Sequence, residues 1–214
     1  MCDSLIGRTD TKYPLSDKQL EEAVGRIEDV LMASLDWRVL IEVLADEVLR
    51  AGIFRSLTIA LVNWEDGYAE IVGNYLAVDR SGKINPDLSK GAIYVEESDK
   101  ADPFLERLDG LRIALADADD FTVRAALSGG VVTQGFIEDT PGVSRIVKIG
   151  YFIPLRCGGR VAAVLSTGSQ PEGQEEMIRR IELMQPLFKQ VALALEHARI
   201  HRALERRQIG RAHV

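Results

Sequence analysis

Reactive side chains are few in this chain of 214 residues, and their spacing limits the chemistry they can perform. The two cysteines, Cys2 and Cys157, lie far apart in the sequence and therefore predict neither a disulfide framework nor a zinc site. Arg156 and Arg160 lie beside Cys157 and would favour its thiolate, as a redox-sensing thiol requires. The alternative is an incidental cysteine in an exposed turn.

Acidic and imidazole groups cluster at two other places in the sequence. Asp117, Asp119 and Asp120 could hold a cation, although Asp119 and Asp120 are also placed to cap a helix. Glu196 and His197 have the order of a phosphoacceptor pair, but no ATP-binding motif follows, which favours a solvent-facing histidine. We therefore predict no catalytic residue, no metal site and no cofactor.

The composition is typical of a globular protein, with 46% hydrophobic and 28% charged residues. A formal net charge of -7 argues against non-specific binding of nucleic acid, which depends on neutralising phosphates. No apolar run approaches the length of a membrane span, and no signal-peptide core follows the start of the chain. We expect a cytoplasmic protein with reduced cysteines that binds neither nucleic acid nor a membrane.

Two helices are predicted near the N-terminus. Residues 1–16 are polar and predict a flexible start. Residues 17–35 predict a coiled-coil-like helix, because its apolar residues are spaced 4, 3 and 4 apart: Leu20, Val24, Ile27 and Leu31. Asp36 is a good N-cap for a second helix over residues 37–50, which Gly52 can end.

Short apolar runs separated by turn residues predict an antiparallel sheet. Between two such runs, the pair Gly158 and Gly159 indicates a hairpin, because a tight turn needs positive φ that glycine adopts at little cost. A helix capped at Asp119 or Asp120 and long loops over residues 79–102 and 137–145 interrupt the strands. The order predicts an α+β fold with strands over residues 57–63, 68–78, 131–136, 147–155 and 161–168, and a further strand or part of a lid over residues 111–115.

One long helix is predicted from about residue 174 to about residue 207. Its apolar residues follow an unbroken seam with spacings of 4 and 3, namely Met177, Ile181, Met184, Phe188, Val191 and Leu195. Pro186 falls inside this seam and should kink the helix. At about 1.5 Å per residue the helix would be roughly 50 Å long, so we expect a partner beyond the domain to meet its far end.

The last seven residues interrupt the charged helical pattern. Residues 209–214 match the translation of a widely used sequencing adapter, and a glutamine codon at position 208 fits the bases just before it. We therefore expect residues 208–214 to be library sequence, with residues 201–207 beginning a signalling-helix linker in a longer native protein. The alternative is a genuine frayed tail.

Four segments together resemble a GAF domain, the ligand-sensing module of bacterial signalling proteins. Residues 151–168 are similar to the final two strands of that family, and residues 190–199 to its closing helix. Residues 125–132 resemble its short helix and the strand before that hairpin, and residues 53–62 resemble its first strand. The resemblance places a GAF domain at residues 36–200, with its last helix starting near residue 174.

The resemblance implies a GAF/PAS-like fold, in which the terminal helices cover one face of a six-stranded antiparallel sheet and a loop-covered pocket lies on the other. It also implies a homodimer through the terminal helices. The dimer-interface residues would then be those of the two seams: Leu20, Val24, Ile27, Leu31, Met177, Ile181, Met184, Phe188, Val191 and Leu195.

Several sub-families of this fold use residues that the sequence lacks. Bilin attachment needs a cysteine that is usually followed by histidine, and Cys157 has no such neighbour. Haem-binding members use a histidine, whereas His197, His201 and His213 all lie near the C-terminus. The reductase members need several pocket cysteines, and the Asn-Lys…Phe…Asp-Glu pattern of cyclic-nucleotide binders is absent.

The resemblance implies a pocket bordered by polar and aromatic side chains. The residues predicted to line it are Tyr75, Tyr94, Phe104, Arg112, Thr133, Phe136 and Tyr151. Arg112 could clamp an anionic ligand or simply be exposed, and the aromatic residues could belong to the core instead.

By the same resemblance, the expected function is non-catalytic sensing of a small molecule. The C-terminal effector would be a histidine kinase, a diguanylate cyclase or a transcriptional activator. Two alternatives stay open, namely a dimerisation module that binds no ligand and a redox sensor or enzyme that uses Cys157.

Overall fold

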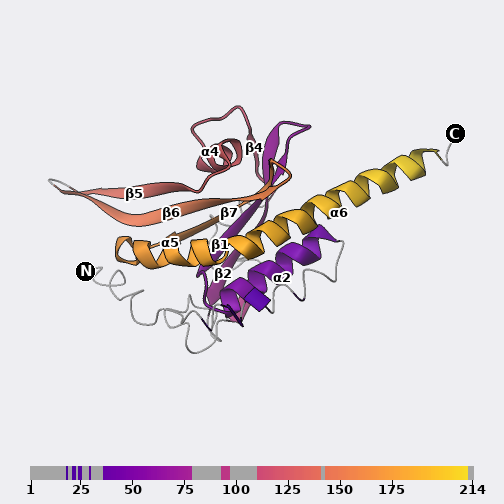
Figure 1. Ribbon diagram of the computed structural model, residues 1–214. Helices are drawn as coiled ribbons and strands as arrows, with labels where there is room; N and C mark the ends of the chain where they lie inside the picture. The colour runs from indigo at the N-terminus through magenta and orange to yellow at the C-terminus, as the bar shows by residue number, and fades with distance from the viewer. Residues whose placement is uncertain are drawn as a thin grey trace.

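A computed structural model of the chain has a sheet at its centre and helices on both faces (Figure 1). It describes residues 36–78, 93–96, 110–140 and 143–211, together with the single positions 18, 21, 22, 24, 25 and 29. Three helices, α2, α5 and α6, lie on one face of the sheet, here called the helix side, and α4 lies on the other, here called the far face. The α+β fold class predicted from the sequence is confirmed.

Every strand pair in the sheet is antiparallel. The order across the sheet is β3-β2-β1-β7-β6-β5, and the short strand β4 pairs with β2 on the side where β3 also pairs. The strands are β1 (Ser56–Asn63), β2 (Tyr68–Val78), β3 (Ile93–Glu96), β4 (Arg112–Ala114), β5 (Val132–Thr140), β6 (Val143–Cys157) and β7 (Arg160–Ser169).

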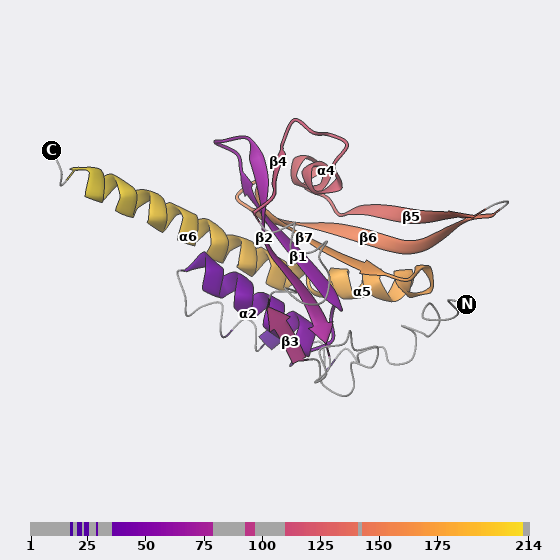
Figure 2. The same ribbon diagram turned by 180° about the vertical axis from the view of Figure 1, so that it is seen from behind.

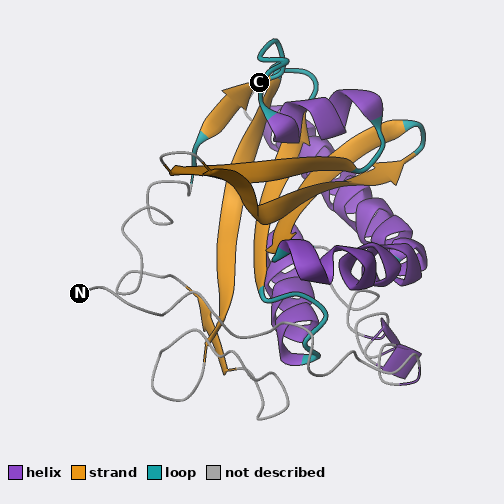
Figure 3. Cartoon of the chain, turned by 90° about the vertical axis from the view of Figure 1, so that its left-hand side faces the viewer, coloured by secondary structure: helices purple, strands orange, loops and turns teal. Residues whose placement is uncertain are grey.

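Local capping chemistry sets the ends of the helices, which are purple in Figure 3. Asp36 accepts a hydrogen bond from the backbone N–H of Arg38 at 3.0 Å and so begins α2. Asp120 caps α4 in the same way, and Gly129, with φ of 64°, ends it. The helices are α2 (Trp37–Arg50), α4 (Phe121–Ser128), the 3-10 helix η2 (Pro171–Gly173), α5 (Gln174–Leu183) and α6 (Gln185–Arg211). Among the described helices, none has both the length and the apolar composition that a membrane span needs.

The larger of two hydrophobic clusters fills the space between the sheet and the terminal helices. Leu44 of α2, Tyr151 of β6 and Phe188 of α6 meet there with almost no exposed surface. Helix α2 lies beside α6, and both rest on the sheet, while α6 continues past the sheet toward the C-terminus (Figure 2). A smaller cluster, which includes Val62 and Ala125, joins α4 to the far face.

The break in the long C-terminal helix lies where the proline predicts it. Helix α5 ends at Leu183, and α6 begins at Gln185, one residue before Pro186. Proline has no N–H to donate to the carbonyl four residues earlier, and its ring crowds that carbonyl. The predicted interruption is therefore confirmed.

The apolar seam of this helix faces the domain itself, which corrects the predicted dimer interface. Met177, Ile181, Met184, Phe188, Val191 and Leu195 are all buried in the helix-side cluster, between the sheet and α2. Val24 also packs partly against that cluster, whereas Leu20, Ile27 and Leu31 lie outside the described residues. A spacing of 4 and 3 identifies one apolar face of a helix, and a sheet can cover that face as well as a second helix can.

The predicted loop over residues 137–145 was wrong, because most of it belongs to the β5–β6 hairpin. The two strands continue to Thr140 and from Val143, with Ile137 paired to Ile146. Pairing of β6 with β7 stops at Ile149, so the hairpin beyond it is a two-stranded ribbon that projects from the sheet (Figure 1). Apolar and charged side chains are both exposed there, with Ile137 62% and Ile146 51% exposed, because solvent reaches both faces of a projecting ribbon.

Strand β3 was also missed, since residues 93–96 fall inside the predicted loop over residues 79–102. Four residues are too few for a periodic signal, and pairing with β2 selects the strand.

Candidate functional site

Three polar side chains lie on the far face of the sheet, opposite the terminal helices. Thr58 stands between Leu57 and Ile59, which both belong to the helix-side cluster, and successive side chains of a strand point to opposite faces. By the same alternation Asn74, which precedes buried Tyr75, and Ser166, which follows buried Leu165, face away from the helices. The far face therefore holds an amide and two hydroxyl groups.

Strand register places these three groups in one row. Thr58 of β1 pairs with Asn74 of β2 on one side and with Ser166 of β7 on the other. Ser166 in turn pairs with Phe152 of β6. Neighbouring strands are about 4.8 Å apart, so the side chains stand next to one another. We call Asn74, Thr58, Ser166 and Phe152 the far-face row.

The amide of Asn74 is buried and unsatisfied. Within the described part of the chain, neither its side-chain nitrogen nor its side-chain oxygen has a hydrogen-bond partner, and both atoms are out of contact with solvent. Leaving such a group unpaired costs about 1–3 kcal/mol. An amide offers two donor hydrogens and an acceptor oxygen, so a ligand that carries both a donor and an acceptor would satisfy it.

Two aromatic rings and a lysine side chain lie around the far-face row. The ring of Phe152 lies 5.5 Å from that of Phe121, at the start of α4. Gly168 follows Ser166 by two residues on β7 and faces the same side, and a Cβ there would lie 2.7 Å from Cε of Lys148. The absence of a side chain at Gly168 therefore leaves room for the lysine chain, which carries a positive charge to the rim of the row.

Two of the predicted pocket residues, Tyr75 and Tyr151, lie on the helix side and not on the far face. Both are buried, and the Tyr151 hydroxyl lies 3.1 Å from the Ser169 hydroxyl. Thr133 pairs with Tyr151 and lines a cavity with it, on the helix side of the sheet. The predicted pocket was expected on the opposite face from the terminal helices, and an offset of one residue along a strand moves a side chain from one face to the other.

Among the other predicted pocket residues, the structure describes the side chains of Arg112 and Phe136. Arg112 is exposed on β4, where its guanidinium lies 3.5 Å from a carboxylate oxygen of Glu70 and over the ring of Tyr68. The arginine that was predicted to bind an anionic ligand is therefore already paired with a carboxylate. Phe136 lies exposed on the projecting ribbon. Tyr94 belongs to β3, whose backbone pairs it with Ala77, and Phe104 lies outside the described residues.

A signal for Asn74 was present in the sequence, because an asparagine interrupts the otherwise apolar run of β2. A polar residue in such a strand usually marks its solvent-exposed face. The structure shows that the Asn74 amide is buried instead. The far-face residues Thr58 and Ser166 gave no signal, because threonine and serine are common in strands at any position.

The other chemistry suggested by the sequence is dispersed. Cys157, at the end of β6, packs partly against the helix-side cluster, on the face away from the far-face row. His197 is exposed on α6. Asp120 is the N-cap of α4, with its carboxylate 2.7 Å from the Thr122 nitrogen. Of the two roles that the sequence left open, helix capping and cation binding, the structure shows capping.

Comparisons with known proteins identify the fold. No protein-family model matches the sequence, and no curated protein matches it. The structure is similar to a GAF domain from a phosphoenolpyruvate-protein phosphotransferase of Coxiella burnetii, with a TM-score of 0.58 and 10% identity over 88% of this chain and 99% of that one.

Two further solved structures show the same likeness. A free methionine-R-sulfoxide reductase from Neisseria meningitidis has a TM-score of 0.55 at 19% identity, over 89% of this chain and 97% of that one. The phycoerythrobilin-bound GAF domain of a cyanobacterial phytochrome has a TM-score of 0.52 at 15% identity, over 87% of this chain and 100% of that one. The antiparallel sheet with terminal helices on one face is therefore that of a GAF domain, and the chain has a GAF-like fold.

Proposed function

We propose that this chain is a non-catalytic, small-molecule-sensing domain of a bacterial signal-transduction protein. The observation that carries the proposal is the buried Asn74 amide on the far face of the sheet, which has no hydrogen-bond partner among the described residues. The hydroxyl of Thr58 stands beside it and that of Ser166 on the next strand beyond, so the ligand would have a polar group that both donates and accepts. Phe152 would border an apolar part of that ligand.

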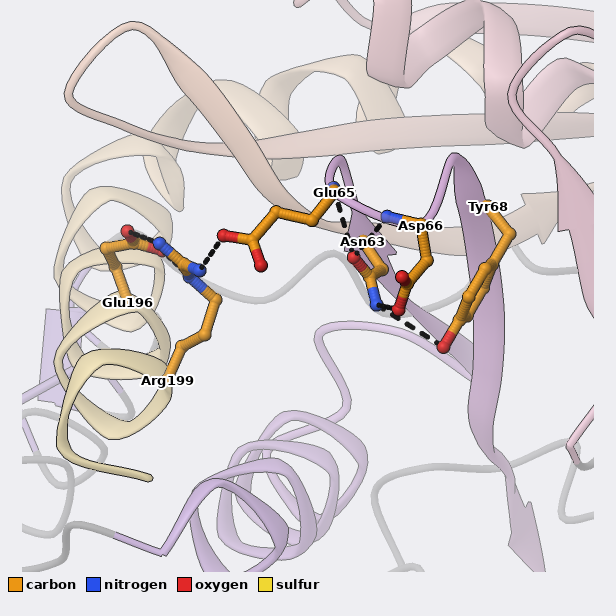
Figure 4. Close-up of polar contacts among 6 residues, drawn as sticks. All are labelled: Asn63, Glu65, Asp66, Tyr68, Glu196 and Arg199. Carbon is orange, nitrogen blue, oxygen red and sulfur yellow. Dashed lines mark hydrogen bonds and ion pairs between the residues drawn. The ribbon is translucent and has the colours of Figure 1, made fainter. Parts of the chain in front are cut away.

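Transmission would run from the sheet to α6 through the β1–β2 turn (Figure 4). Arg199 of α6 donates to a carboxylate oxygen of Glu65 in that turn at 3.2 Å and to Glu196 of its own helix at 2.8 Å. Asn63 fixes the turn by accepting from the backbone N–H groups of Glu65 and Asp66. Because Asn63 ends the strand that contains Thr58, ligand-induced movement of β1 would reach α6 directly.

We propose a histidine kinase or a diguanylate cyclase as the effector that α6 would control. The choice follows the sequence resemblance, together with a terminal helix that continues past the sheet (Figure 2). Coupling between ligand and effector requires that the ligand bind two arrangements of α6 with different affinity.

Catalysis is not proposed, although a reductase is among the similar structures. A thiol enzyme at the far-face row would need its cysteine there, and Cys157 packs toward the opposite face. A redox-sensor role for Cys157 predicts that Cys157→Ser abolishes the response of the protein to oxidants.

The test of the sensing proposal is a thermal-shift screen of the purified chain against nucleotides, tetrapyrroles, amino acids and aromatic acids. We expect one class of compound to raise the melting temperature. Thr58→Val should lower the affinity for that ligand by about tenfold, because a hydrogen bond is lost. Thr58→Ser is the matched control, because it removes the methyl group at the same position and keeps the hydroxyl. No shift with any class, or an equal effect of both variants, would refute the far-face site.

A dimerisation module without a ligand is the second candidate, and exposed apolar residues of α6 favour it. Leu193, Ile200 and Leu204 are 47%, 44% and 53% exposed. With exposed His197 they follow spacings of 4, 3 and 4, the pattern that a partner helix would cover. The homodimer would then form on this outward face of α6 instead of the buried seam.

A further inference from the structure

A cavity of about 540 Å³ lies on the helix side of the sheet, beside the break between α5 and α6. It exists because β5 pairs with β6 only as far as Phe152, so none of the described strands lies beside the last residues of β6 on that edge. The loop after Gly129 and the two helices surround the space that remains. We call it the helix–edge cavity.

The walls of the helix–edge cavity are mainly apolar. Ile178 and Ile181 contribute from α5, Phe188 from α6 and Tyr151 from β6. Ile178 and Val131, at its sides, are 40% and 44% exposed, so large apolar side chains face open space there. A cavity of several hundred Å³ with apolar walls is typical of sites that bind small molecules.

Charged side chains stand around this cavity with a positive excess. Arg156 of β6 and Lys189 of α6 line it, against the single carboxylate of Glu182 from α5. Arg156 donates from Nη1 to the carbonyl oxygen of Gly129 at 3.3 Å, which holds the guanidinium beside the loop. This arrangement complements an apolar molecule that ends in an anionic group.

We propose that the helix–edge cavity binds a small amphipathic carboxylate, either a medium-chain aliphatic acid or an aryl-alkyl acid. Its apolar body would pack against Ile178 and Val131, the lining residues with exposed apolar surface, and its carboxylate would lie near Arg156 and Lys189. The molecule would touch both helices at their break, and its binding would favour one angle between α5 and α6. This site lies on the face opposite Asn74 and is independent of the sensing proposal.

The experiment is calorimetric titration of the full chain with decanoate below its micellar concentration. We expect saturable binding of one molecule per chain, and an affinity about tenfold weaker for the neutral analogue decanamide. No saturable binding, or equal affinity for the two compounds, would overturn the proposal.

Two matched pairs of variants locate the binding. Ile178→Asp should lower the affinity for decanoate by about tenfold or more. Leu193→Asp, at a similarly exposed apolar position of α6, should leave that affinity unchanged. Lys189→Glu should weaken the binding of decanoate but not that of decanamide, while Arg202→Glu, further along the same helix and outside the cavity lining, should leave both affinities unchanged. Circular dichroism verifies that each variant is folded, and equal losses within either pair would place the binding elsewhere.

Discussion

At the scale of single residues, Arg180 carries a charge into the helix-side core. Only 9% of its surface is exposed, and its Nη1 donates to the carbonyl oxygens of Gly52 and Ile53 at 3.0 Å each. Its Nε donates to Glu176 at 2.8 Å. One guanidinium therefore joins α5 to the segment between α2 and β1, and its charge is compensated by the carboxylate.

Removing this guanidinium should destabilise the fold. Arg180→Met leaves two buried carbonyl oxygens without their donor, and we expect the free energy of unfolding to fall by about 2–4 kcal/mol. Arg179→Met is the control, since Arg179 donates to the same carboxylate from a half-exposed position. Urea denaturation measures both, and an equal loss in the two variants would contradict the role assigned to Arg180.

Glu176 predicts how stability depends on pH. Hydrogen bonds from Arg179, and then from Arg180, lower the pKa of this carboxyl below its ordinary value of 4.5. Because the folded pKa is the lower one, its contribution to stability is present above about pH 4.5 and is lost as the pH falls further. Glu176→Gln should therefore be less stable than the wild type near neutral pH and approach it in acid. Urea denaturation at several pH values from neutral to acid measures the difference in unfolding free energy between the two proteins. A difference that does not change with pH would contradict the assignment.

At the scale of elements, the cap of α4 decides where this helix begins. Asp120 accepts hydrogen bonds from the backbone N–H groups of Thr122 and Val123 at 2.7 and 3.1 Å. We expect Asp120→Ala to lower the free energy of unfolding by about 1 kcal/mol, and Asp119→Ala to change it by less. Melting temperatures measured with and without a divalent cation distinguish a capping role of Asp120 from a cation-binding role. A cation-induced rise in melting temperature, lost in Asp120→Ala, would contradict a purely capping role.

At the scale of the whole molecule, α6 presents two apolar faces, one covered by the domain and one exposed. The inner face is buried under the domain's own sheet and α2, and the outer face exposes Leu193, Ile200 and Leu204. A helix that continues past its domain with such a face favours association with a second copy.

The proposed dimer makes the outer face testable by sedimentation velocity. The double variant Leu193→Glu with Leu204→Glu should raise the dimer dissociation constant by about tenfold or more, since it places like charges across a symmetric seam. Leu127→Glu is the control, because Leu127 is equally exposed on α4, away from that seam. A monomeric wild type at all accessible concentrations would contradict the dimer.

The sequence by itself determined the elements whose signals are local. The Gly158–Gly159 turn, the caps at Asp36 and Asp120 and the interruption at Pro186 each follow from backbone chemistry within a few residues. The order of these elements, with the resemblance they carry, was enough to predict the antiparallel GAF-like sheet.

Only the tertiary structure decided which face each residue takes and what covers it. Tyr75 and Tyr151 were predicted in the pocket yet lie in the helix-side core, while neighbouring Asn74 faces the opposite side. The seam from Met177 to Leu195 was predicted to meet a second chain and instead meets the domain's own sheet. The physical reason is the same in both cases. Periodicity shows which residues share a face, but only packing of distant segments determines the partner of that face.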